Sequence, residues 1–107
     1  MGCLPNAHDV HLQRAWESCR RGIDAILSDT TDRELVLSWI DEKNRSFNSP
    51  FLAKWRLIVS GELPELVTEL RRTSTFFDLP EDRQSEWCRM VQSHPFAVII
   101  ARSRASA

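Results

Sequence analysis

The stretch LQRAWESCRRGIDAI, residues 12–26, decides the fold class. Its apolar residues recur in steps of four, three, four and three, at Leu12, Trp16, Cys19, Ile23 and Ile26. Steps of this kind place side chains on one side of an α-helix. We therefore predict an amphipathic helix from about His8 or Asp9 to Leu27, with Asp9 as its N-cap.

The same helical spacing continues after this first helix. Thr31 and Glu34 are three residues apart, which predicts a capping box at the start of a second helix. Ser49-Pro50 combines a capping residue with proline at the first helical position, as is typical of a helix start. Gly61 is expected to end this third helix, because glycine tolerates the left-handed conformation found there.

Two more helices are predicted beyond Gly61. Proline opens the fourth at Pro64, and its apolar spacing lasts until Arg71-Arg72. Asp78 with Glu81 is expected to cap the fifth, which must end near Ser93 because a proline follows.

The segment FAVIIA, residues 96–101, fits either an edge strand or a short helix. We prefer a fully buried sixth helix that begins at Pro95, because no second strand exists to pair with a strand here. The predicted fold is therefore all-α: a compact bundle of five helices plus a short C-terminal helix. Residues 1–107 are expected to form a single helical domain, with flexible ends at 1–7 and 102–107.

Composition narrows the function classes. The 107 residues carry a net charge of −1, so no overall electric field would draw the chain to nucleic acid or to an anionic membrane. Three widely spaced cysteines do not suggest a disulfide framework and indicate a reducing compartment. No apolar run approaches the roughly 18 residues that cross a bilayer, and no secretory signal is visible. We expect a cytoplasmic protein that does not associate with membranes.

Part of the sequence resembles a known group. The resemblance covers residues 42–97, about half the chain. The residues that carry it are Asn44, Asn48-Ser49-Pro50-Phe51, Trp55, Leu57, Leu66, Leu70 and Ser93-His94-Pro95-Phe96-Ala97. This stretch is similar to small uncharacterised bacterial and prophage helical proteins. Those carry an asparagine-rich turn before a tryptophan-bearing helix and end in a Ser-Pro-Phe-Ala motif, which His94 interrupts here. The resemblance implies a helical fold and a bacterial or prophage origin, and it implies no activity.

Chemically reactive residues do not combine into a site. The pair His8-x-x-His11 has a spacing suited to metal ligands, with Cys3 nearby, but a zinc site needs at least three protein ligands close together. Cys19 belongs to the apolar side of the first helix, where burial makes a thiol inert. A Cys88–His94 pair would still need an orienting group and an oxyanion site. We expect no metal, no cofactor and no enzymatic activity.

Binding to nucleic acid is an alternative. Residues 50–73 can be arranged as a helix-turn-helix with Gly61 in the turn. The contacts would come from Lys54, Arg56, Arg71 and Arg72. The second helix would carry Glu62, Glu65 and Glu69 toward the phosphates, where negative charge is repelled. We therefore favour two packed helices over a DNA-reading unit.

The aromatic residues suggest binding to another protein. Trp16, Trp39, Trp55 and Trp87 fall at positions typical of a core. Phe76-Phe77 lie in a predicted loop, and they either fill the core from above or project toward a partner. Arg71 and Arg72 are expected beside them. These four residues are the predicted contacts of an adaptor, inhibitor or antitoxin-like regulator of unknown partner.

A homodimer is a further hypothesis. The apolar side of the first helix spans two heptads and could pair with a copy of itself. We prefer core packing for this side, because the same helix must also cover the bundle.

Overall fold

The computed structural model describes residues 7–46 and 48–100, and these residues contain helices and connecting turns but no strand. The elements are α1 (Ala7–Ser28), α2 (Thr30–Ser46), α3 (Pro50–Val59), α4 (Pro64–Arg72), the 3-10 helix η1 (Phe76–Asp78) and α5 (Glu81–Gln92). Residues 97–100 are helical as well. The predicted all-α fold is confirmed. Apart from Ala7, which begins α1, the ends predicted to be flexible lie outside the described residues.

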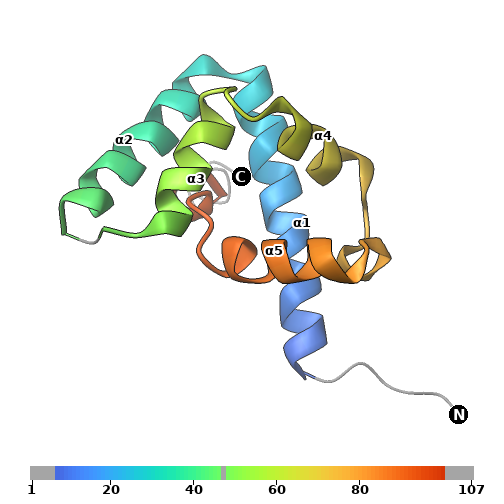
Figure 1. Ribbon diagram of the computed structural model, residues 1–107. Coiled ribbons are helices and arrows are strands. Elements are labelled where there is room, and N and C mark those ends of the chain that lie inside the picture. The colour runs from blue at the N-terminus through green and yellow to red at the C-terminus, as the bar shows by residue number, and fades with distance from the viewer. Residues whose placement is uncertain (1–6, 47, 101–107) are drawn as a thin grey trace, which may run out of the picture.

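Helix α1 passes through the middle of the molecule (Figure 1). It contacts α2, α4, η1 and α5, whereas α3 packs against α2, α4 and α5. The predicted apolar side of α1 is buried along its whole length, with every one of its five residues at most 5% exposed. Core packing of this side is therefore confirmed, and it leaves no free surface there for a homodimer. Within the described residues, no helix has both the length and the apolar character needed to cross a membrane.

Three predicted helix caps are wrong. Asp9 lies inside α1, which begins at Ala7. At the start of α2 the Asp29 side chain accepts a hydrogen bond from the backbone N–H of Thr31 (2.8 Å). Asp29 therefore caps this helix, and the predicted capping residue Thr31 lies within it. Before α5 the cap position is Pro80, because Asp78 ends η1 instead.

The predicted boundaries of α3 are confirmed. Ser49 is its N-cap and accepts a hydrogen bond from the backbone N–H of Leu52 (3.4 Å), with Pro50 as the first helical residue. Gly61 follows the helix with φ at +85°, the left-handed conformation that favours glycine.

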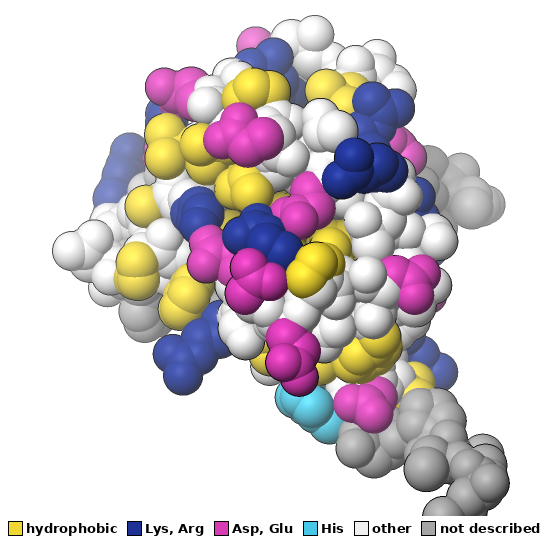
Figure 2. Space-filling model, turned by 45° about the vertical axis from the view of Figure 1, so that its right-hand side comes forward, with side chains coloured by type: hydrophobic (Ala, Val, Ile, Leu, Met, Phe, Trp, Pro, Cys, Tyr) yellow, Lys and Arg dark blue, Asp and Glu magenta, His cyan; other side chains and the backbone are white. Residues whose placement is uncertain are grey.

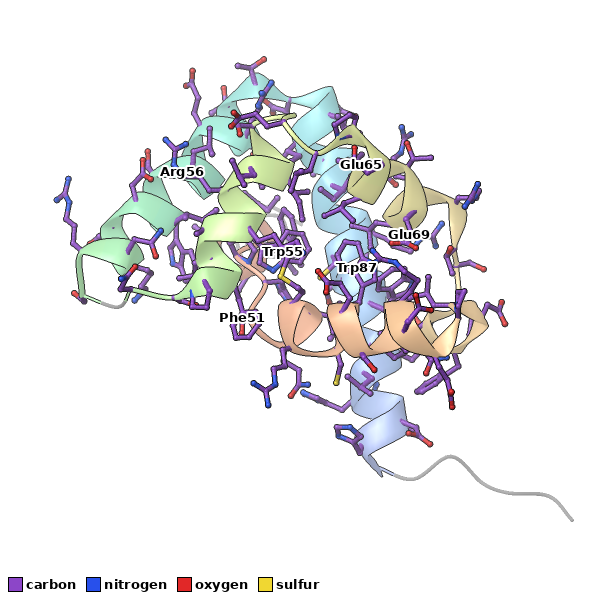
Figure 3. All side chains as sticks on the ribbon, in the orientation of Figure 1. Phe51, Trp55, Arg56, Glu65, Glu69 and Trp87 are labelled. Atoms are coloured by element: carbon purple, nitrogen blue, oxygen red, sulfur yellow. The ribbon has the colours of Figure 1, made fainter. Side chains whose placement is uncertain are left out.

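A row of aromatic rings crosses the core. Neighbouring ring centroids are 5.1–5.9 Å apart, and most pairs meet edge to face, the arrangement preferred by aromatic rings. In order along the row, the rings belong to Phe77, Phe76, Trp16, Trp87, Trp55 and Phe96. We call these six residues the aromatic row. Figure 3 shows Trp55 and Trp87 beside one another at the centre of the molecule, with Glu69 reaching toward Trp87 from α4.

Each buried indole N–H has an acceptor. Trp16 donates to the Thr73 carbonyl (2.7 Å) and Trp55 to the Met90 carbonyl (2.8 Å). Trp87 donates to a carboxylate oxygen of Glu69 (2.7 Å). Trp39 is half-buried and packs against the edge of the core, and the Lys43 ammonium lies 5.6 Å from its ring centroid.

The C-terminal helix begins later than predicted and is not fully buried. Its first residue is Ala97, two positions after Pro95. Phe96 and Ile99 are buried, whereas Ala97 is exposed. Phe96 packs against Gly22 of α1 so closely that a Cβ atom added to this glycine would lie 2.2 Å from the Phe96 Cγ. Glycine is therefore required here by packing.

We expect Gly22→Ala to destabilise the protein by about 1–3 kcal/mol, because overpacking outweighs the gain of roughly 1 kcal/mol that alanine brings to an ordinary helix. Urea unfolding followed by circular dichroism measures this change. The neighbouring exposed residue supplies a control, since Arg21→Ala should shift the free energy of unfolding by less than about 0.5 kcal/mol. The loss should shrink in a Phe96→Ala background. An equal or greater loss there would show that Phe96 is not the obstacle.

Candidate functional site

The structure separates the two adjacent phenylalanines. Phe76 is 1% exposed and its ring meets Trp16 at 5.7 Å, whereas Phe77 is 41% exposed. Successive residues of a 3-10 helix point about 120° apart, so η1 turns one ring inward and the next outward. The prediction of Phe76 as a partner contact is therefore corrected: Phe76 belongs to the core, and Phe77 alone presents its ring to solvent.

Phe77 is exposed but supported. Its ring packs edge to face on Phe76, with centroids 5.1 Å apart, and Phe76 in turn contacts Trp16. Phe77 is thus the outer end of the aromatic row.

Gln13 of α1 fixes the loop that carries these rings. Its amide nitrogen donates to the Ser74 carbonyl (3.2 Å), and its amide oxygen accepts from the backbone N–H of Phe76 (2.8 Å). Trp16, one turn further along α1, holds the Thr73 carbonyl. Side chains of one helix therefore position the loop from below.

A surface groove lies between Phe77 and the first turns of α1. It has a volume of about 410 Å³, and we call it the Val10–Phe77 groove; its lining residues are Asp9, Val10, Gln13, Arg14, Glu17, Thr75 and Phe77. Val10 is 36% exposed, and Val10, Arg14 and Glu17 share one face of α1 through their spacing of four and three. Figure 1 shows that these first turns of α1 extend below α5.

Sequence reasoning missed Val10 and the role of Gln13. Val10 does not belong to the buried side of α1, and an apolar residue on the polar face of a predicted amphipathic helix was the available signal. The sequence gives no indication of the role of Gln13, because its two hydrogen bonds to the loop join residues that are 61 and 63 positions apart.

Arg71 and Arg72 do not line this groove. The Arg71 guanidinium pairs with Asp24 at 3.2 Å. Asp24 lies 14 residues after Val10, which is about 21 Å along the helix axis. Arg72 is exposed on the last turn of α4, next to Arg71. Neither arginine therefore belongs to the lining of the groove, and their contact with a partner stays a prediction.

The geometry does not favour the nucleic-acid alternative. Three of its four cations are paired with carboxylates: Lys54 with Glu86, Arg56 with Asp41 and Arg71 with Asp24. Cations that already have carboxylate partners are less available to phosphates. Glu65 is exposed on the first turn of α4 (Figure 3). Figure 2 shows acidic and basic side chains intermixed on the visible face rather than a continuous basic surface.

Cys19 is buried, whereas Cys88 and His94 are half-buried and each accept a hydrogen bond. Burial raises the pKa of the Cys19 thiol well above its ordinary value, which disfavours the nucleophilic thiolate. The Cys88 sulfur accepts from the Gln92 amide (3.4 Å), and His94 Nδ1 accepts from the backbone N–H of Phe96 (3.2 Å). Cys3 lies outside the described residues. Within those residues no cluster of three or more His, Cys, Asp or Glu could hold a metal ion.

Comparison of the chain with known protein families, curated proteins and solved structures gives no match.

The burial of His94 makes stability depend on pH. Burial lowers the pKa of His94 below its ordinary value of 6.5, since desolvation disfavours the imidazolium. As pH falls through that ordinary value, the unfolded chain gains a proton that the folded protein does not, so the free energy of unfolding decreases. The decrease ends once pH reaches the lowered pKa of the folded state.

We therefore expect the thermal midpoint of the protein to fall between about pH 7 and pH 5. His94→Asn keeps an acceptor for the Phe96 N–H but does not titrate, so its midpoint should depend less on pH. Differential scanning calorimetry across this range measures both proteins. Parallel pH profiles would show that another group is responsible.

Proposed function

We propose that this protein acts by binding another protein through the Val10–Phe77 groove, as a non-enzymatic adaptor, inhibitor or antitoxin-like regulator in the cytoplasm of a bacterium or phage-infected cell. One observation carries the proposal: Phe77 is 41% exposed although its ring packs on the buried ring of Phe76, whose backbone N–H is held by Gln13. An aromatic side chain that is already immobilised loses little conformational entropy on binding, so more of its contact energy contributes to affinity.

The chemistry of the groove favours a particular kind of partner. Val10 and Phe77 can receive one large apolar side chain between them. Arg14 and Glu17 are exposed on the same face of α1 and carry opposite charges. The Gln13 amide also donates to Glu17 (3.1 Å), and Asp9 supplies a second carboxylate to the lining. We infer a partner segment that offers an exposed leucine, methionine or phenylalanine to this groove.

The compartment and the lack of catalysis belong to the same proposal. Cys19 and Cys88 are free thiols, as is usual in a reducing environment. Both are removed from the groove, and its titratable residues are Asp9, Arg14 and Glu17, which suit recognition by charge. The bacterial or phage origin rests on the sequence resemblance of residues 42–97.

Phe77→Asp tests the proposal. We expect this variant to lose a partner that the wild-type protein captures from a lysate of its source cells, with at least a tenfold decrease in the amount recovered. A charge placed at the centre of an apolar contact must be desolvated, and a tenfold change corresponds to about 1.4 kcal/mol. Quantitative mass spectrometry compares the recovered proteins. Val10→Asp should lose the same partner.

Leu57→Asp is the matched control. Leu57 is 40% exposed, almost the same as Phe77, but it lies on α3 and does not line the groove. This variant should keep the partner, and circular dichroism should show equal helicity for all three variants. Equal loss of the partner in Leu57→Asp and Phe77→Asp, or its retention in Phe77→Asp, would contradict the proposal.

A further inference from the structure

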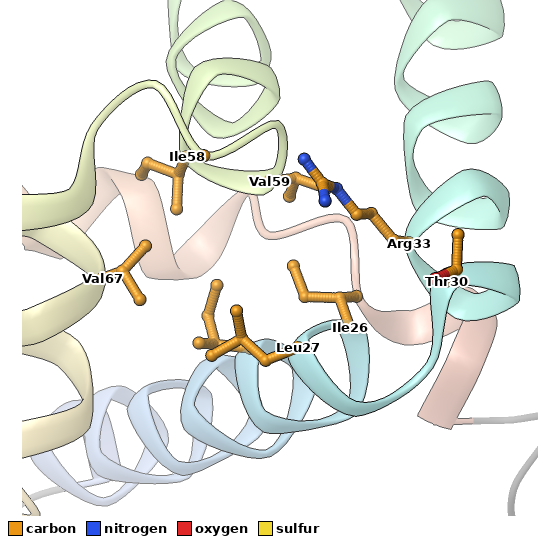
Figure 4. A pocket seen from close by; sticks show the side chains of 9 residues that line it. Ile26, Leu27, Thr30, Arg33, Ile58, Val59 and Val67 are labelled. Carbon is orange, nitrogen blue, oxygen red and sulfur yellow. The ribbon is translucent and has the colours of Figure 1, made fainter.

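A second cavity lies between α1, α2 and the turn that joins α3 to α4. Its volume is about 150 Å³, and it shares no lining residue with the Val10–Phe77 groove. Four buried aliphatic side chains form its walls: Ile23, Ile26, Ile58 and Val59. Its remaining lining residues are Leu27, Thr30, Arg33, Gly61 and Val67. Figure 4 shows Ile26 and Leu27 of α1 facing Ile58 and Val67 across this space.

The walls of the cavity are suited to an apolar group. Protein interiors are close-packed, and apolar cavities of this size are uncommon. A cavity of about 150 Å³ has room for a molecule of the size of benzene. The four wall residues are each at most 5% exposed, so a group bound among them would contact apolar side chains of the core.

Arg33 gives the cavity one charged end. Its guanidinium lies beside Val59 (Figure 4) and donates from Nη2 to the Ser60 carbonyl (2.8 Å). Gly61 lies next to it: a Cβ atom at this glycine would be 3.8 Å from the same nitrogen, an ordinary van der Waals contact. A guanidinium has five N–H donors in a planar fork, so it can bind a carboxylate while it keeps the contact to Ser60.

The N-terminus of α2 adds positive potential at the Arg33 end of the cavity. Thr30 is the first residue of this 17-residue helix, and a helix N-terminus attracts negative charge. Asp29 caps the helix through the Thr31 N–H and reduces that attraction. Arg33 is therefore the main source of positive potential at the cavity.

We propose that this cavity binds a short branched aliphatic carboxylate, with its hydrocarbon tail among the three isoleucines and its carboxylate on the Arg33 guanidinium. A four-carbon branched tail matches the size of the cavity. With about seven non-hydrogen atoms in the ligand, the dissociation constant should be on the order of 1 mM. The proposal is independent of the proposed protein binding, because the two sites share no residue.

Titration with three probes tests the site. Methyl NMR spectra of the protein should respond to 3-methylbutanoate and to benzene, with shifts confined to the methyl groups that line the cavity, those of Ile23, Ile26, Leu27, Thr30, Ile58, Val59 and Val67. The neutral amide of the same acid should bind at least tenfold more weakly than the carboxylate. Absence of binding of the carboxylate and of benzene, or equal affinity for acid and amide, would overturn the proposal.

Two substitutions distinguish the contribution of the ligand's hydrocarbon tail to binding from that of its carboxylate. Val67→Phe should fill the cavity and weaken binding of all probes at least tenfold, with Val67→Met as a milder version if the larger ring prevents folding. Arg33→Gln should weaken binding of the carboxylate at least tenfold and change benzene binding by less than about twofold. Leu66→Phe is the control, since Leu66 neighbours Val67 on α4 but does not line the cavity. Unchanged carboxylate binding in both Val67→Phe and Arg33→Gln would place the ligand elsewhere and overturn the proposal.

Discussion

The arrangement of the helices depends on one constraint: each of three buried tryptophans needs a hydrogen-bond acceptor for its indole N–H. Trp16 uses the carbonyl that follows α4, and Trp55 uses a carbonyl in the last turn of α5. Trp87 uses the Glu69 carboxylate in the middle of α4. An unpaired buried donor costs about 1–3 kcal/mol, a large part of the 5–15 kcal/mol that stabilises a typical domain. A helix that slid or rotated would lose such a bond, so the indoles determine how α1, α3, α4 and α5 align.

Glu69 connects this constraint to the surface chemistry. Its carboxylate accepts the Trp87 N–H and also binds Arg83 through two guanidinium nitrogens, at 2.6 and 3.0 Å. The bond from Arg83 is the main reason that the pKa of Glu69 lies below its ordinary value. These bonds turn the Glu69 face of α4 toward α5. A helix whose middle is engaged in this way cannot present that face to a DNA groove, which is a physical argument against the helix-turn-helix alternative.

The fold was predictable from the sequence where the decisive interactions are local. The placement of the surface side chains was not, because it depends on contacts between distant residues. The spacing of Leu12 to Ile26, the Ser49 cap and the Gly61 turn each act within a few residues, and the structure confirms them. Asp29 and Thr31 are both good capping residues, so the choice between them depends on where the previous helix ends. Phe76 and Phe77 are identical in local context, and only the turn of η1 distinguishes them. The pairing of Arg71 with Asp24 joins residues 47 positions apart, beyond the reach of any spacing rule.

Exposure by itself does not distinguish a binding residue, because isolated apolar side chains are normal on protein surfaces. Leu27, at 56%, is more exposed than Phe77, yet no ring contact or loop clamp supports it and it lies at the mouth of a different cavity. Phe77 differs because it ends the aromatic row: its ring packs on the buried ring of Phe76, and Gln13 holds the backbone N–H of Phe76. The same packing that aligns the helices thereby fixes one ring at the surface. A partner that binds this ring would meet a side chain whose conformational entropy was already lost on folding, and this is the physical basis for proposing Phe77 as the contact residue.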